Sequence, residues 1–146
     1  MTRNTIVSAA CAAALVAMSA SAHAQMSDNV VKIGVLTDMS GTYSDLTGAG
    51  AVLATRMAID DFIAKEKPSF KIEMVSSDHQ NKGDIAANKA REWIERDKVD
   101  TVTELVTTSV ALAVMKIAKE KNRIALISGA ASTPITNEQC NDITVH

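Results

Sequence analysis

The sequence predicts an α/β fold, an open doubly wound parallel sheet of strand order 2-1-3-4-5 with helices on both faces. Short apolar runs alternate with longer stretches of helical spacing, which indicates parallel strands joined by right-handed crossovers. Residues 30–37 (VVKIGVLT) are almost continuously apolar, as expected of a strand that is covered on both faces. In residues 70–77 apolar and charged side chains alternate, so this strand is expected at the edge of the sheet.

The helices are expected where apolar side chains recur every three or four residues. The first is expected at residues 49–65, and Asp84 and Ser109 are expected to cap the second and third. Asn122 is expected to end the third helix in a left-handed conformation. The later strands are expected at residues 99–106, 124–128 and 143–146. The three apolar stripes consist of Val52, Thr55, Ile59, Phe62 and Ile63; Ala86, Ala90, Trp93 and Ile94; and Val110, Ala113, Val114, Ile117 and Ala118.

The first 24 residues have the composition of a secretory signal. Arg3 is their only charged side chain, an apolar run covers residues 6–18, and Ala22-His23-Ala24 forms a small-residue cleavage pattern. The run is about 13 residues long, short of the ~20 that span a bilayer. We therefore expect cleavage after Ala24, export to the periplasm, and no stable membrane insertion afterwards. Cys11 lies inside the run, which argues against lipid attachment.

The composition suits one globular unit in residues 25–146. The chain is 47% hydrophobic and 22% charged, with a formal net charge of -2, which excludes a highly charged disordered tail and a basic nucleic-acid binder. After export Cys140 is the only cysteine left, and an unpaired thiol is uncommon in an oxidising compartment. We expect its partner, if it has one, outside this chain.

Small hydroxyl side chains follow every strand of the predicted sheet. They occur in residues 38–44, 76–79, 107–109 and 128–133, and the carboxyl ends of parallel strands meet at one edge, where ligands bind. Hydroxyls, free backbone N–H groups and a helix start at Ser109 can hold a carboxylate without a full positive charge. The residues therefore favour a small polar ligand. The alternative, that these residues serve only turns and caps, stays open.

Catalytic and cofactor sites lack the residues that they require. His79, beside Asp78, is more often a loop hydrogen-bonder than a general base, and adjacent side chains point apart, which disfavours a serine triad. The chain has no Gly-x-Ser-x-Gly elbow, no phosphate-binding P-loop, and no Gly-x-Gly-x-x-Gly turn after the first strand. It also has no Cys/His spacing typical of a metal site. We expect no catalysis, no cofactor and no metal.

Three segments resemble a known family: KIGVLTDMSGTYSDLTGAGAVLATRMAIDDF, DHQNKGDIAANKAREWI and VALAVMKIAKEKNRIALISGAAST. Together they resemble the first lobe of an extracytoplasmic solute-binding protein of the branched-chain amino acid type, the periplasmic binding protein type I that feeds an ABC transporter. The resemblance covers residues 31–146 and implies two lobes that close on a solute. That solute would be a branched-chain amino acid, an amide, or a small or aromatic carboxylic acid, delivered to permease subunits. The second lobe is not in this sequence, so we expect a truncated first lobe that binds weakly by itself.

The resemblance also implies which residues touch the solute. Ala130 and Ser132 match the place that holds a carboxylate or amino group, and Thr108 and Ser109 match a companion hydroxyl site. Tyr43 is the side chain expected to pack on the solute. Two other functions stay open: an extracytoplasmic ligand-sensing domain of a receptor system, and a small exported hydrolase that would depend on His79.

Overall fold

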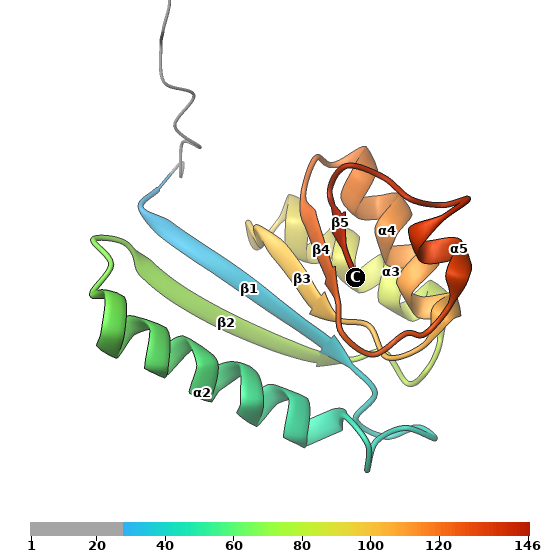
Figure 1. The fold of residues 1–146 in the computed structure, drawn as a ribbon, viewed down its shortest axis with the longest axis horizontal. Helices are drawn as coiled ribbons and strands as arrows, with labels where there is room; N and C mark the ends of the chain where they lie inside the picture. Colours follow the sequence, from blue (N-terminus) through green and yellow to red (C-terminus); the bar gives the residue numbers. More distant parts are fainter. Residues whose placement is uncertain (1–27) are drawn as a thin grey trace, which may run out of the picture.

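Five parallel strands form one sheet in the order β2-β1-β3-β4-β5 (Figure 1). The computed structural model describes residues 28–146, and the predicted signal and its cleavage site lie outside this range. Both the fold class and the strand order predicted from the sequence are confirmed. The strands are β1 (Val30–Thr37), β2 (Lys71–Asp78), β3 (Thr101–Glu104), β4 (Ile124–Ile127) and β5 (Thr144–Val145).

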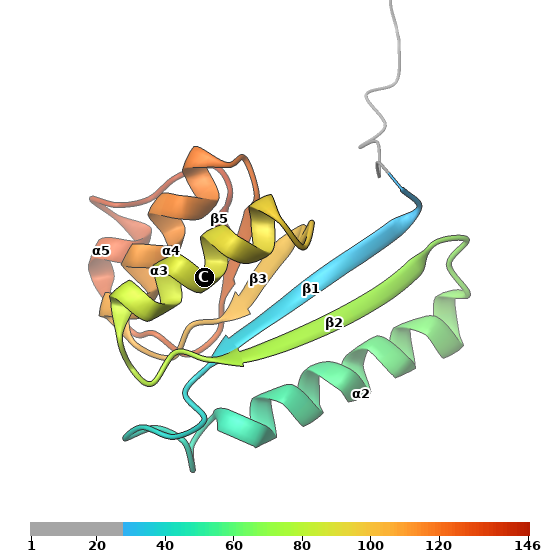
Figure 2. The same cartoon turned by 180° about the vertical axis from the view of Figure 1, so that it is seen from behind.

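The helices lie on both faces of the sheet, as predicted. Helix α2 (Gly48–Glu66) covers β1 and β2 on one face, while α3 (Gly83–Glu95) and α4 (Thr108–Glu120) pack side by side on the other (Figures 1 and 2). The short α5 (Thr133–Thr136) was not predicted. Its first turn contains Pro134, whose restricted φ suits that position.

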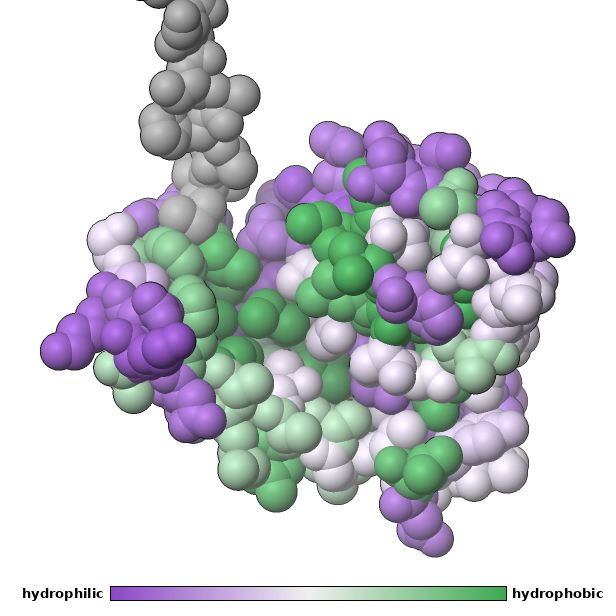
Figure 3. All heavy atoms as spheres, in the orientation of Figure 1, coloured by the Kyte–Doolittle hydropathy of each residue, from purple (hydrophilic) through white to green (hydrophobic). Residues whose placement is uncertain are grey.

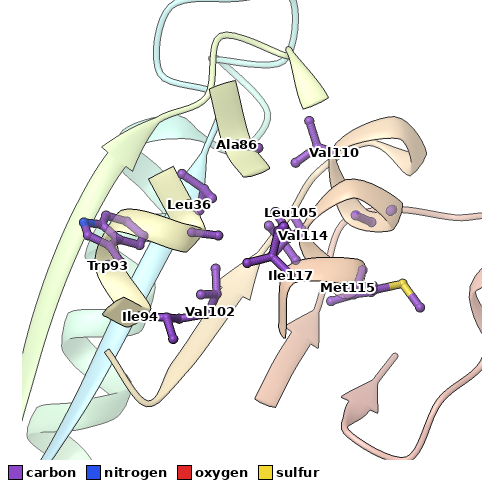
Figure 4. Packing of buried hydrophobic residues seen from close by; sticks show 14 of the residues in the cluster. Leu36, Ala86, Trp93, Ile94, Val102, Leu105, Val110, Val114, Met115 and Ile117 are labelled. Carbon is purple, nitrogen blue, oxygen red and sulfur yellow. The ribbon is translucent and has the colours of Figure 1, made fainter. Parts of the chain in front are cut away.

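The main core lies between the sheet and the α3–α4 pair (Figure 4). Most residues of the two predicted stripes belong to it, together with residues of the sheet and its loops, and Trp93 is its largest member. Ala113 of the predicted stripe is only partly buried. The indole packs over Gly34 of β1, where a Cβ would lie 2.7 Å from two ring carbons. A glycine inside this strand therefore makes room for the tryptophan.

The face of the sheet that carries α2 is only partly covered. Ile59 is buried, but Phe62 and Ile63 of the predicted stripe remain 42% and 41% exposed, so the stripe is confirmed only in part. Leu126 of β4 and Ile124, two residues before it, face the same side and are also exposed. An apolar groove of about 590 Å³ runs between α2 and this bare part of the sheet, and Figure 3 shows hydrophobic residues gathered there.

Two predicted helix caps are wrong. Helix α3 has Lys82 at its N-cap and Asp84 inside its first turn, and α4 has Thr107 at its N-cap and Ser109 inside its first turn. Neither cap residue makes a side-chain capping bond. The Thr107 hydroxyl instead donates to Asn81 Oδ1 at 2.8 Å. At the start of α4 the N-cap hydroxyl of Thr107 therefore bonds to a residue of another loop, and the capping bond predicted from the local sequence does not form.

Backbone conformation explains two element ends. Asn122 has φ 51 and follows α4, which confirms the predicted left-handed stop. Glu104 and Leu105 have φ values of 87 and 60, outside the extended range, so β3 ends at Glu104 and is shorter than the predicted strand of residues 99–106.

Candidate functional site

The loop after β1 is held by a buried carboxylate. Asp38 is fully buried, and its two oxygens accept hydrogen bonds from Gly41 N–H at 2.7 Å and Tyr43 N–H at 2.9 Å. A Cβ at residue 41 would lie 2.5 Å from Asp38 Oδ1, so this close approach requires glycine. Charge-assisted bonds of this kind are strong, and they set the position of Tyr43 at the edge of the sheet.

Asp78 ties the end of β2 to the same loop. Its carboxylate accepts hydrogen bonds from Met39 N–H at 2.9 Å, Ser40 Oγ–H at 2.5 Å and Gln80 N–H at 2.7 Å. Burial acts to raise the pKa of Asp78, but the hydrogen bonds from Ser40, Met39 and Gln80 and the neighbouring His79 together hold the pKa below its ordinary value of 3.8. The Asp78 carboxylate therefore joins two of the loops that the sequence predicted would meet.

The lowered pKa of Asp78 predicts a loss of stability in acid. Because the folded state binds the Asp78 proton less tightly than the unfolded state, this stabilisation is present above pH 3.8 and lost as the pH falls through the folded pKa. We expect Asp78→Asn to lower the free energy of unfolding by about 1 kcal/mol at neutral pH, a small value because the carboxylate is solvent-screened. Urea denaturation at neutral and acid pH would measure this difference, which should shrink below about pH 4.

Asp61→Asn, on the exposed face of α2, is the matched control and should change stability little at any pH. An Asp78→Asn penalty that persisted undiminished in acid would show that shape, and not charge, accounts for the effect.

His79 follows Asp78 and is fully buried. Its Nδ1 accepts a hydrogen bond from Asn81 N–H at 2.9 Å, which places the ring proton on Nε2. Burial lowers the pKa of His79, against the opposing effect of the Asp38 and Asp78 carboxylates, so the imidazole is neutral. In the described part of the chain Nε2 has no hydrogen-bond partner. The contact to Asn81 is the loop hydrogen bond that the sequence favoured for this histidine.

An open hollow of about 440 Å³ lies at the carboxyl edge of the sheet, where α4 begins. It brings together three of the residues that the resemblance implied, Tyr43, Thr108 and Ser109. Ala130 is buried next to Ala131, which does line the hollow, and the Ala130 carbonyl contacts the His146 ring. Ser132 lies outside the lining as the N-cap residue of α5.

The sequence analysis did not single out Asn81, which also lines the hollow. Asn81 comes just after β2, has φ 54, and accepts the hydrogen bond of Thr107. An asparagine in a left-handed turn is a recognisable signal, but it indicates a turn and not a binding residue. Its role depends on the meeting of two loops distant in sequence.

The hollow offers hydrogen-bond donors without a formal positive charge. No lysine or arginine is among the residues that line it. At the start of α4, the first turn of backbone N–H groups has no side-chain cap and carries the positive end of the helix dipole. The hydroxyls of Thr108 and Ser109 stand in the same turn. This arrangement suits a carboxylate.

Residues 28–146 contain neither a candidate metal site nor a helix able to span a membrane. Among them no group of three or more His, Cys, Asp or Glu side chains is placed to hold a metal ion. No helix in the same range combines the length and the apolar character needed to cross a membrane.

A parallel α/β sheet with a hydroxyl-lined hollow at its carboxyl edge defines the class of α/β ligand-binding lobes. The sequence profile described as "Periplasmic binding protein" matches residues 30–146. The chain therefore belongs to the periplasmic binding protein family.

Solved structures agree with this assignment. A periplasmic binding protein from Burkholderia mallei is 45% identical over 81% of this chain and 31% of its own, with a TM-score of 0.75. A branched-chain amino acid ABC transporter periplasmic ligand-binding protein from Burkholderia xenovorans is 41% identical over 76% and 29%, with a TM-score of 0.71. An ABC transporter solute-binding protein from R. palustris, solved with 4-hydroxybenzoate, is 26% identical over 80% and 31%, with a TM-score of 0.64.

This chain therefore spans less than a third of the length of these three proteins. A search of curated proteins gave no match.

Proposed function

We propose that this chain contributes part of the solute site of a periplasmic binding protein. The solute is a small molecule with a carboxylate, either an amino acid or an aromatic acid. The protein delivers it to the permease of an ABC transporter and does no chemistry on it. The observation that carries the proposal is the hollow at the start of α4, which Thr108 and Ser109 of the uncapped first turn line together with Tyr43.

Each part of the hollow has a counterpart in such a solute. The first-turn N–H groups and the two hydroxyls would donate hydrogen bonds to the carboxylate. Tyr43 is partly exposed and held by the Asp38 bond to its backbone, so its ring is available to an apolar side chain or aromatic ring. Ala131, without a long side chain, leaves space for the body of the solute.

The relatives support the carboxylate as the shared feature. The Burkholderia xenovorans protein is described as a ligand-binding protein of a branched-chain amino acid ABC transporter, and the R. palustris protein was solved with 4-hydroxybenzoate. Amino acids and 4-hydroxybenzoate differ in size and polarity but both carry a carboxylate. The signal predicted in residues 1–24 supports a periplasmic location.

Calorimetry with matched solutes tests the proposal. Leucine and 4-hydroxybenzoate would be titrated into the exported, purified chain, alongside their amides leucinamide and 4-hydroxybenzamide. We expect one acid to bind weakly, because a single open hollow buries little of a ligand, and its amide to bind about tenfold more weakly or not at all. Ser109→Ala combined with Thr108→Val should weaken binding of that acid by about tenfold.

Ser69→Ala is the control variant, because Ser69 is exposed just before β2, at the opposite edge of the sheet. It should bind as the parent chain does. Equal binding of acids and amides, or an unchanged affinity in the Thr108 and Ser109 double variant, would contradict the proposed site.

A further inference from the structure

Glu104 is a buried acid with an unused hydrogen-bonding atom. Its side chain is only 6% exposed, and among residues 28–146 its Oε2 has no hydrogen-bond partner. Buried carboxyl oxygens normally find a donor, so an unpartnered one requires an explanation. The backbone here is also unusual, because Glu104 and Leu105 are consecutive non-glycine residues with positive φ. Such conformations persist where the surrounding structure enforces them, often at binding sites.

Glu104 is one of the residues that line a cavity of about 540 Å³ between the first half of α2 and the ends of β3 and β4. Gly129 makes room for it, since a Cβ there would lie 3.0 Å from Glu104 Oε1 and 2.8 Å from Val106 Cα. The cavity shares only Val106 with the hollow at the start of α4, so the two are separate. Its other walls are small or apolar residues and hydroxyls: Leu46, Thr47, Gly50, Ala51, Ala54, Thr55, Thr103, Ser128 and Gly129.

The charge around Glu104 is negative. Burial raises the pKa of its carboxyl and Asp38 raises it further, while Thr37 and the Val106 N–H act in the opposite direction. Asp38 makes no hydrogen bond to Glu104, and its two oxygens accept hydrogen bonds from backbone N–H groups of its own loop. None of the other residues that line the cavity, from α2, β3 or the loop after β4, is titratable. What Glu104 Oε2 lacks, among residues 28–146, is a hydrogen-bond donor.

We propose that this cavity binds an organic cation with an apolar body, whose primary ammonium or guanidinium group donates a hydrogen bond to Glu104. An ammonium group has three donors. One would reach Glu104, and Thr47 and Ser128 line the same cavity. The Thr47 hydroxyl already donates to the Tyr43 carbonyl and accepts from Thr37, which leaves one lone pair on its oxygen for the cation. The small side chains of Gly50, Ala51 and Ala54 leave space for an alkyl chain. Such a cation can be a free amine or a lysine or arginine side chain of a polypeptide.

Thermal unfolding of the full chain with butylammonium chloride, at matched ionic strength, tests the proposal. We expect butylammonium to raise the melting temperature, and the isosteres butanol and butyrate to have no effect at the same concentration. In Glu104→Gln, which keeps the size of the side chain, the apparent dissociation constant should rise by about tenfold or more. Glu138→Gln is the control, because Glu138 is exposed and outside this cavity, and should respond as the parent chain does.

A second arm identifies the source of the cation. A capped Gly-Lys-Gly peptide and a capped Gly-Arg-Gly peptide would be compared with butylammonium and butylguanidinium. Binding of the small cations alone assigns a free amine, and tighter binding of a peptide assigns a polypeptide side chain. Both results uphold the cation site. A shift with calcium chloride but with none of these compounds would overturn it.

The pH dependence of butylammonium binding can be measured on the parent chain, so this test does not require that a variant folds. A cation binds the ionised Glu104, so its affinity should fall as the pH falls through the raised pKa. Tighter binding of butyrate in acid would mean that a protonated Glu104 donates to an anion, and would overturn the proposal. Loss of butylammonium binding in Ser109→Ala would also overturn it, because Ser109 belongs to the other hollow. If the carboxylate site proposed at the start of α4 fails its own test, the results expected for cation binding at Glu104 stay the same.

Discussion

Replacing Gly34 with alanine is expected to lower the free energy of unfolding by about 3 kcal/mol. The new Cβ would lie 2.7 Å from two ring carbons of Trp93 and 3.2 Å from Val99 Cγ1. The indole is 95% buried between α3 and the sheet, and Val99 is fully buried, so neither side chain can move aside without disturbing the core. Urea denaturation followed by circular dichroism would measure the loss.

Two variants show whether the Trp93 contact is responsible. Gly50→Ala adds the same methyl group inside α2 with no atom within 4 Å, and should raise stability by about 0.5–1 kcal/mol. In a Trp93→Phe background the cost of Gly34→Ala should fall, because the smaller ring leaves space for the methyl group. A cost that is unchanged in that background would show that backbone strain, and not the indole, opposes the alanine.

Asp38→Ala is expected to have a comparably large effect, lowering the free energy of unfolding by about 3 kcal/mol. The change leaves Gly41 N–H and Tyr43 N–H without the buried carboxylate that accepts their hydrogen bonds. The loop between β1 and α2 should then open locally. Because Tyr43 lines the hollow at the start of α4, the affinity for the proposed solute should fall as well.

Amide hydrogen exchange is the direct measurement for Asp38→Ala. Protection of the Gly41 and Tyr43 amides should be lost, while protection in α3 and α4 should fall only as far as global stability does. Asp45→Ala, an exposed position in the same loop, is the control and should change stability by less than about 0.5 kcal/mol. Retained protection at Gly41 and Tyr43 would show that the loop stays closed without the Asp38 carboxylate, and would contradict this prediction.

Strand patterns in the sequence predicted the architecture well. The apolar run of β1 has the bounds expected, and helices on both faces of the sheet, α2 on one and α3 on the other, explain why this strand has almost no polar side chains. The alternation in β2 correctly placed it at the edge. The stripe of α2 was less informative, because Phe62 and Ile63 were expected to be buried and are partly exposed. Periodicity shows which side of a helix is apolar, but not how much of that side is covered.

The predictions that failed depend on contacts between distant loops. Capping by Ser109 is a local expectation, whereas the bond from Thr107 to Asn81 forms only when two loops meet. The sequence did not indicate Glu104 as a site residue, because a single acid in the strand expected at residues 99–106 resembles an exposed polar position. Its burial follows from the local turn of the backbone and from the space left by Gly129, and neither feature is visible in a periodic pattern.

The position of β1 has a consequence for how the chain acquires its structure. This strand is synthesised first, but its hydrogen-bonding partners are residues 71–78 on one side and 101–104 on the other. Until both segments have left the ribosome, β1 has no neighbour to pair with, and pairing of distant parallel strands is intrinsically slow. The strand that is made first therefore stays incompletely paired until residue 104 has been synthesised, and the centre of the sheet forms late.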